Sequence, residues 1–213
     1  MLLELRRWVV PPGHQVQLKE VTWAELECIL EELGDRGNPR LSYSHGTLEL
    51  MSPSPEHEDR KDILSHLVEI LLEESDIEFR NLGSTTFKNQ QMDQAVEPDA
   101  CFYIEHEAEI RGKRRIDLTV DPPPDLAIEI DITARTRFNN YAALGVPELW
   151  RYNGSTLEIS VLWEGQYVDS ERSLHFPNLP IMEVIPDYLE QSRSSGRTSL
   201  LRSFRRWVQD RMG

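Results

Sequence analysis

The stretch PDLAIEID, residues 124–131, is typical of a β-strand with two different faces. Side chains two residues apart in a strand point to the same face. One face carries the apolar residues Leu126, Ile128 and Ile130. The other carries Asp125, Ala127, Glu129 and Asp131. Because an unpaired buried carboxylate is costly, the acids at 129 and 131 need partners. These are either a functional ligand or the basic residues near 111–115, 135 and 137.

The N-terminal half predicts helices and strands in alternation. Thr22 and Glu25 form a capping-box pattern that opens a helix ending at Leu33, before Gly34. Residues 40–51 predict a hairpin about Ser44-His45-Gly46. Apolar residues at helical spacing then predict a helix over about 56–74.

The second half predicts mainly strands. Three segments read as strands before residue 105, namely 77–82, 84–88 and 98–104. Residues 105–124 are polar and end in prolines, which predicts a long loop or protruding hairpin. A short helix is expected over about 136–144, before Gly145. Residues 148–170 predict a three-stranded meander with two-residue turns.

These elements predict a mixed α/β protein: one β-sheet flanked by helices, in the order α-β-β-β-α-β, with a C-terminal β-hairpin extension and a terminal helix. Residues 1–190 are expected to form a single domain. Residues 191–213 predict a basic amphipathic helix that packs on the body or on a partner chain.

The charge is distributed unevenly. The chain of 213 residues has a formal net charge of −14. Six arginines and one aspartate in residues 191–213 give +5, which leaves −19 for the first 190 residues. Proteins that bind duplex DNA over a broad surface are usually basic, so any nucleic-acid contact must be local. No apolar run approaches the ~20 residues that span a bilayer, and the N-terminus lacks a signal-peptide pattern. A cytoplasmic protein without membrane contact is expected.

Four segments together resemble one family. They are GTLELMSPSPEH (46–57), EPDACFYI (97–104), PPPDLAIEIDIT (122–133) and YAALGVPELWRY (141–152). The combination resembles the Uma-type family of restriction endonucleases, within the PD-(D/E)XK nuclease superfamily, over residues 20–190. The resemblance implies a restriction-endonuclease-like fold and Mg²⁺- or Mn²⁺-dependent hydrolysis of DNA phosphodiester bonds by a metal-activated water. Asp99 and Glu129 match the two acids of the family motif and are the expected metal ligands.

The sequence departs from the motif at one position. The superfamily places a lysine two residues after its second acid, and Asp131 stands there. The resemblance implies that a lysine can stand on the following helix instead, at the position of Arg137. This residue lies one helical turn before Tyr141, a candidate accessory residue. We count Asp131 and Arg137 with Asp99 and Glu129 as candidate catalytic residues, although an arginine cannot act as a general base.

The remaining candidates are a histidine, an acid and a basic cluster. His57, at the start of a predicted helix, is either a capping-region residue or a residue that orients a ligand. Glu49 on the preceding strand is a candidate accessory acid. The basic residues Arg111, Lys113, Arg114 and Arg115 either pair with acids of their own loop or contact nucleic acid.

Two function classes therefore follow from the sequence. The first is a metal-dependent endonuclease that contacts nucleic acid, expected to be DNA, and a homodimer is one expectation for it. The alternative is a nuclease-fold protein that no longer cuts and serves as a binding or scaffold module. Asp99 and Glu129 favour the first, whereas Asp131, Arg137 and the charge of −14 favour the second.

Overall fold

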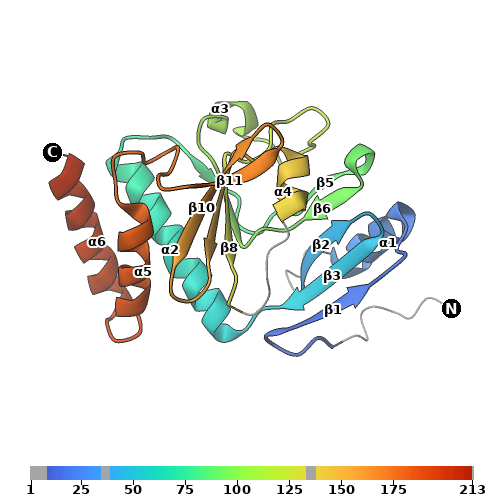
Figure 1. Ribbon diagram of the computed structural model, residues 1–213, viewed down its shortest axis with the longest axis horizontal. Helices are drawn as coiled ribbons and strands as arrows, with labels where there is room; N and C mark the ends of the chain where they lie inside the picture. The colour runs from blue at the N-terminus through green and yellow to red at the C-terminus, as the bar shows by residue number, and fades with distance from the viewer. Residues whose placement is uncertain (1–8, 35–38, 133–137, 213) are drawn as a thin grey trace.

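The computed structural model describes residues 9–34, 39–132 and 138–212. Two β-sheets and the helices on their faces form the structure (Figure 1). The mixed α/β class expected from the sequence is confirmed. The expectation of one sheet was wrong, because the strands of the N-terminal half pair with one another and with two short later strands.

The six-stranded sheet has the order β11-β10-β9-β8-β7-β4. Its strands are β4 (Arg80–Asn81), β7 (Ala100–Tyr103), β8 (Leu126–Ile130), β9 (Glu148–Tyr152), β10 (Leu157–Trp163) and β11 (Gln166–Ser170). β8 and β9 run parallel, and the other neighbours run antiparallel. The residues expected to form a hairpin extension are therefore part of the main sheet, because β9 pairs with the central strand β8.

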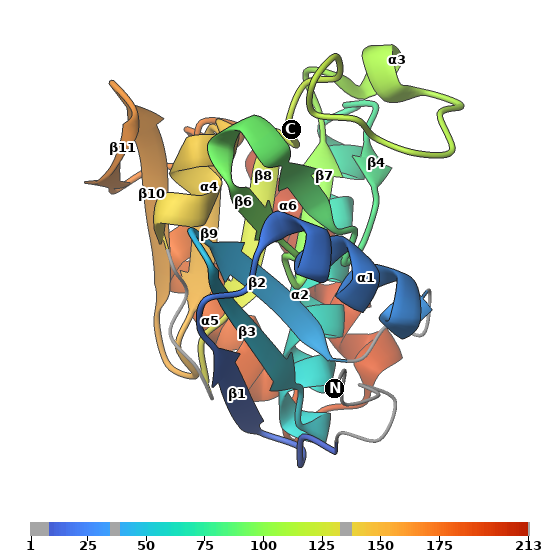
Figure 2. The same cartoon turned by 90° about the vertical axis from the view of Figure 1, so that its right-hand side faces the viewer.

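The five-stranded sheet is antiparallel throughout and has the order β1-β3-β2-β6-β5. Its strands are β1 (His14–Leu18), β2 (Arg40–Ser44), β3 (Thr47–Ser52), β5 (Phe87–Asn89) and β6 (Gln94–Val96). In Figure 2 this sheet lies in front of the six-stranded sheet, with α1 on its outer side. The chain passes from one sheet to the other between β6 and β7, through the three residues Glu97-Pro98-Asp99.

The helices are α1 (Trp23–Leu33), α2 (Pro55–Glu74), α3 (Glu107–Ile110), α4 (Phe138–Leu144), α5 (Ile181–Gln191) and α6 (Arg197–Met212), with a 3₁₀ turn η3 at Gln90–Met92. Local sequence explains where two of them start. Thr22 accepts from the Glu25 N–H while the Glu25 carboxylate accepts from the Thr22 N–H, as a capping box requires. Ser54 accepts from the N–H of His57, and Pro55 occupies the first turn of α2, where a missing N–H costs nothing.

Strand alternation divides the core around the six-stranded sheet. Ala100, Phe102 and Ile128 pack on the side of α2, α5 and α6, whereas Cys101 and Ala127 pack on the opposite side with α4. Figure 1 shows α2, α5 and α6 together on one side of this sheet. The side facing α4 and the five-stranded sheet carries the odd-numbered residues of β7 and β8, including the candidate acids.

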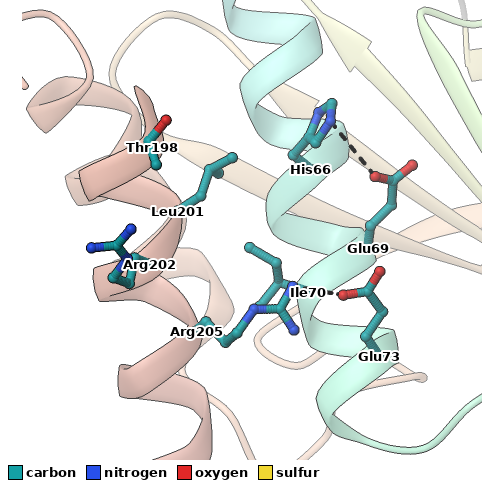
Figure 3. Close-up of a pocket in the computed structure, with 8 residues that line it drawn as sticks. All are labelled: His66, Glu69, Ile70, Glu73, Thr198, Leu201, Arg202 and Arg205. Carbon is teal, nitrogen blue, oxygen red and sulfur yellow. Dashed lines mark hydrogen bonds and ion pairs between the residues drawn. The ribbon is translucent and has the colours of Figure 1, made fainter. Parts of the chain in front are cut away.

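The basic C-terminal helix packs on α2. Leu200, Phe204 and Val208 of α6 are buried in the core that α2 shares with the sheet. Its arginines face the acids of α2: Arg197 pairs with Asp62, and Arg205 pairs with Glu73 and Glu74. Figure 3 shows the groove between these helices, lined by His66, Glu69, Ile70, Glu73, Thr198, Leu201, Arg202 and Arg205. Part of the excess positive charge of the tail is thus neutralised within the molecule.

Candidate functional site

Asp99 lies at the point where the chain changes sheets. Its backbone N–H donates to the carbonyl of Ile128 (3.1 Å), and its Oδ2 accepts from the N–H of Ile130 (2.8 Å). The residue is 3% exposed. These two contacts on β8 hold the Asp99 side chain beside the strand that carries Glu129.

Glu129 lies on the same sheet face as Asp99, since both follow the alternation of Cys101 and Ala127. Burial, followed by the charge of Asp99, raises the pKa of Glu129 well above its ordinary value, which indicates that the two carboxyl groups lie close together.

Tyr141 and Asp131 complete the surroundings of Glu129. The hydroxyl of Tyr141, which is 1% exposed, donates to Glu129 Oε1. Burial, followed by the charge of Glu129, raises the pKa of this tyrosine, so it remains a donor at neutral pH. Asp131 follows β8, and its charge further raises the pKa of Glu129. The structure therefore brings together Asp99, Glu129, Asp131 and Tyr141.

His57 also belongs to this cluster. Its ring is 0% exposed, and Nε2 lies 3.1 Å from Asp99 Oδ2. Within the described part of the chain, neither ring nitrogen makes an aligned hydrogen bond. His57, in the first turn of α2, is thus a buried ring that contacts Asp99 of the acid pair through Nε2.

Arg40 of β2 is a site residue that the sequence analysis missed. Its Nε lies 3.6 Å from Asp99 Oδ1, one terminal nitrogen lies 3.0 Å from Glu97, and the other lies 3.2 Å from Glu58. Arg40 is 6% exposed. The Arg40 guanidinium therefore connects three elements. Arg40 belongs to β2 of the five-stranded sheet, and it contacts Glu58 at the start of α2 and Asp99 at the start of β7 in the six-stranded sheet. The sequence did contain a signal for the side on which Arg40 lies, because the polar residues Arg40, Ser42 and Ser44 alternate with the buried Leu41 and Tyr43. Alternation defines the face of the strand but does not show which residues the side chain contacts.

Arg151 of β9 was missed as well. It stands in register with Glu129 on the neighbouring parallel strand, so the two side chains leave the sheet on one face. One of its terminal nitrogens lies 3.7 Å from Asp131 Oδ2, and the other contacts Glu158. Asp131, at the position of the superfamily lysine, is thus engaged by an arginine from the next strand.

Two further candidates from the sequence are Glu49 and Arg137. Glu49 is on β3 of the five-stranded sheet, where it accepts from Gln17 Nε2 (3.0 Å). Arg137 falls in the segment 133–137, outside the described residues. The proposed roles of both residues stay predictions.

The basic cluster at 111–115 lies in the loop that joins the end of β7 to the start of β8. Asp99 and Glu129 are at the opposite ends of these strands, about 13 Å away along β8 at ~3.3 Å per residue. Arg111 pairs with Glu107 of the short helix α3, and Lys113 pairs with Asp121, whereas Arg114 and Arg115 are exposed. The loop is not a protruding hairpin, and it does not border the acid pair.

Asp125 anchors this loop. Its buried carboxylate accepts from the backbone N–H groups of Ile104 (2.7 Å) and His106 (3.1 Å) and contacts His106 Nδ1 (2.5 Å). Partial burial disfavours the charged imidazole, but the hydrogen bond to Asp125 and its charge outweigh this and raise the pKa of His106. Asp125 is thus a buried structural hydrogen-bond acceptor and not a solvated surface acid.

Among the described residues, no group of three or more His, Cys, Asp and Glu side chains has an arrangement that holds a metal ion by itself. The helices within these residues are also too short or too polar to cross a bilayer. The acid pair Asp99–Glu129 is therefore the candidate cation site, with ligands beyond these two supplied by water or substrate.

A mixed sheet that brings Asp99 and Glu129 to one face, with helices packed on it, defines a candidate hydrolytic site of the nuclease type. A family model supports this class: the model of the Uma2 family, described as "Putative restriction endonuclease", matches residues 23–193. The chain belongs to this family, and the assignment gives it a nuclease-type function.

Among solved structures, the chain is similar to one described as a "putative nuclease belonging to DUF820 from Anabaena variabilis ATCC 29413". The sequence identity is 16%, the TM-score is 0.48, and the match covers 71% of this chain and 92% of that one. No curated protein matches the sequence.

Proposed function

We propose that this protein is a metal-dependent endonuclease that hydrolyses DNA phosphodiester bonds, with Asp99 and Glu129 as its metal ligands. The observation that carries the proposal is geometric: the buried Asp99 carboxylate accepts from the N–H of Ile130, the residue next to Glu129, and both acids lie on one sheet face. Two acids side by side in a largely buried site are unfavourable unless a proton or a cation lies between them.

The residues present fit a divalent cation such as Mg²⁺ or Mn²⁺. Mg²⁺ usually takes one or two carboxylates and completes its shell with waters and phosphate oxygens, and this matches a pair rather than a cage of acids. His57 adds buried ring nitrogens without aligned partners in the described structure. A divalent cation in such a site supplies activation of water and neutralisation of the charge that develops on the phosphate.

The other side chains position the two acids. Arg40 and the N–H of Ile130 fix the Asp99 carboxylate from two directions. The Tyr141 hydroxyl fixes Oε1 of Glu129. Because each of these donors is itself buried, the acids keep one orientation before any ligand arrives, and preorganisation of this kind favours binding.

Basic side chains are proposed to make the contacts with the DNA phosphates. The exposed Arg114 and Arg115 can contact phosphates of a duplex that extends beyond the acid pair. Arg137 is proposed to face the scissile phosphate. A homodimer would present two acid pairs to one duplex.

One observation favours the alternative, a nuclease-fold module that does not cut. Asp131 occupies the place of the superfamily lysine and forms an ion pair with Arg151. A site without a titratable lysine lacks one common general base. In this alternative the pocket binds a cation or nucleic acid without turnover.

The substitution Glu129→Gln tests the proposal. Glutamine keeps the shape of the side chain and an oxygen that can accept from the Tyr141 hydroxyl, so the fold should be retained. It cannot supply the negative charge that a divalent cation requires. We expect Mn²⁺ to raise the melting temperature of the wild type, since a ligand that binds only the native state stabilises it, and not that of the variant. Cleavage of plasmid DNA with Mg²⁺ or Mn²⁺ should be abolished.

The matched control is Glu158→Gln, which removes the same group from a half-exposed position beside Arg151. This control should keep both the Mn²⁺ response and the cleavage. Equal Mn²⁺ responses in wild type and Glu129→Gln would place the cation site elsewhere and overturn the proposal. An Mn²⁺ response that depends on Glu129, without any cleavage by the wild type, would select the non-cutting alternative.

A further inference from the structure

Helix α4 lies where the two sheets meet. It contacts β2 and β6 of the five-stranded sheet and β11 of the six-stranded sheet. Figure 2 shows α4 between β10 and β6. The helix has seven residues, and a helix this short is marginal without tertiary contacts. Its position therefore depends on the side chains that attach it to the two sheets.

Two consecutive residues of α4 attach it to different sheets. Successive side chains leave a helix about 100° apart. The hydroxyl of Tyr141 donates to Glu129 of β8, in the six-stranded sheet. Asn140 donates through Nδ2 to the hydroxyl of Ser42 (2.8 Å) and to the carbonyl of Tyr43 (3.3 Å), both in β2 of the five-stranded sheet. The helix thus connects the candidate metal ligand Glu129 to the other sheet.

The side chain of Asn140 is completely buried. The backbone carbonyl of Tyr43 can only accept a hydrogen bond, so the amide nitrogen of Asn140 must face it. The amide oxygen Oδ1 then has no hydrogen-bond partner within the described part of the chain. A buried acceptor without a partner costs free energy. The two hydrogen bonds of Asn140 therefore define the position of α4 on β2 at a cost in burial.

The strand β2 gives Asn140 a firm support. β2 pairs with β3 on one side and with β6 on the other. The side chain of Tyr43 is buried, and its hydroxyl donates to the carbonyl of Val21 (3.0 Å). The ring of Trp23 in α1 packs edge-on against the Tyr43 ring, with 5.8 Å between the ring centroids. A group bonded to β2 is thus held in place by the packing of the N-terminal sheet.

We propose that Asn140 is a positioning residue for the cation site: by holding α4 on β2, it places the Tyr141 hydroxyl against Glu129 and fixes the orientation of that carboxyl group. The inference rests on the proposed function, since it requires Glu129 to bind the cation. Arg40 of the same strand contacts Asp99. Both members of the acid pair are then oriented from β2, one directly and the other through α4.

The expected effect on the affinity for a cation is large. Groups that orient a metal ligand without touching the metal commonly change metal affinity about 10–100-fold when they are removed. Asn140→Ala removes the two hydrogen bonds that join Asn140 to β2, so the Tyr141 hydroxyl no longer has one fixed position against Glu129. Binding of Mn²⁺ should weaken about tenfold, and Tyr141→Phe should weaken it by a similar factor.

A double-mutant cycle tests whether Asn140 acts through Tyr141. Isothermal titration calorimetry with Mn²⁺ alone measures the affinity of the wild type, of Asn140→Ala, of Tyr141→Phe and of the double variant. The double variant should bind Mn²⁺ about as weakly as either single variant, because the second substitution removes a contact that the first has already impaired. Two independent contributions would instead multiply to about a hundredfold.

Asn139→Ala is the matched control, since it makes the same change at an exposed position of the same helix. It should leave the affinity for Mn²⁺ unchanged. Ser42→Ala alters the acceptor on β2 and leaves α4 intact. It should weaken Mn²⁺ binding by less than Asn140→Ala, because the carbonyl of Tyr43 remains. A merely structural role of Asn140 would lower the melting temperature without changing the Mn²⁺ affinity of the folded protein.

The outcomes separate this inference from the proposed function. Mn²⁺ binding that depends on Glu129 but is unchanged in Asn140→Ala, or in Ser42→Ala where Asn140→Ala does not fold, would overturn the inference alone. Effects of Asn140→Ala and Tyr141→Phe that multiply, or an equal loss in Asn139→Ala, would do the same. Mn²⁺ binding that Glu129→Gln leaves intact, or no Mn²⁺ binding by the wild type, would overturn the proposed function and this inference with it.

Discussion

Replacing Arg40 by methionine tests whether the cluster around Asp99 is held by a single cation. Methionine keeps much of the volume of the arginine stem and removes the guanidinium from three carboxylates. Two of these, on Asp99 and Glu97, belong to side chains that are 2% and 11% exposed. Removing one partner of a buried ion pair typically costs about 3–5 kcal/mol, because the remaining charge is left uncompensated. For a chain of this length that loss lowers the melting temperature by about 6–20 °C.

The pH dependence of this loss has a defined sign. Burial raises the pKa of Glu97, and Arg40 opposes that rise, so the variant should raise the pKa of Glu97 further. A carboxyl whose folded pKa exceeds its unfolded value of about 4.3 contributes stability that is complete below that value and is lost as pH rises through the folded pKa. The difference between wild type and Arg40→Met should therefore be largest near pH 7 and shrink toward pH 4. Urea unfolding at several pH values measures it.

Arg205→Met is the matched control. Arg205 also contacts two carboxylates, those of Glu73 and Glu74, but its side chain is 39% exposed. Exposed pairs contribute about 0–1 kcal/mol each, so this variant should lose far less stability. A loss below 1 kcal/mol for Arg40→Met at pH 7, or a larger loss that does not change with pH, would refute the reasoning.

Two further predictions concern the anchors of the fold. Asp125→Asn should lower the pKa of His106, measured by NMR titration, and destabilise the protein most at low pH; a His whose folded pKa is raised contributes stability that is complete below about pH 6.5 and is lost as pH rises through the folded value. An unchanged His106 titration would contradict this. Thr22→Ala should cost about 1 kcal/mol in denaturant unfolding, because it removes the side chain that caps α1, and a loss below about 0.3 kcal/mol would show that Glu25 alone suffices.

Local features of the fold could be predicted from the sequence because neighbouring residues encode them. The capping box at Thr22 and Glu25, the hairpin of β2 and β3 and the extent of α2 follow from residues a few positions apart. Helix α5 was not expected, since Pro186 lies within it and proline normally interrupts a helix. The division of the strands into two sheets also escaped prediction, because alternation defines the faces of a strand but not its neighbours.

In the candidate site, too, the local pattern was predicted and the contacts between distant segments were not. Alternation along 124–131 predicts that Glu129 points away from the apolar face, and the structure brings Glu129 and Asp99 together. Arg40 and Arg151 reach the acids from other strands. Their roles depend on strand order and register, which the pattern of a single segment does not contain. Interactions across long sequence separations were therefore the part that sequence reasoning missed.

The crossing from β6 to β7 has a mechanical consequence. The three-residue link Glu97-Pro98-Asp99 joins the sheets, and Arg40 spans the same joint by contacting both acids of the link. The angle between the two sheets therefore sets the separation of Arg40 from Asp99. A change in the packing of α1 that tilted the five-stranded sheet would therefore change the distance from Arg40 to Asp99. Substitutions in the N-terminal sheet, far from the acids in sequence, would reach Asp99 through this one arginine.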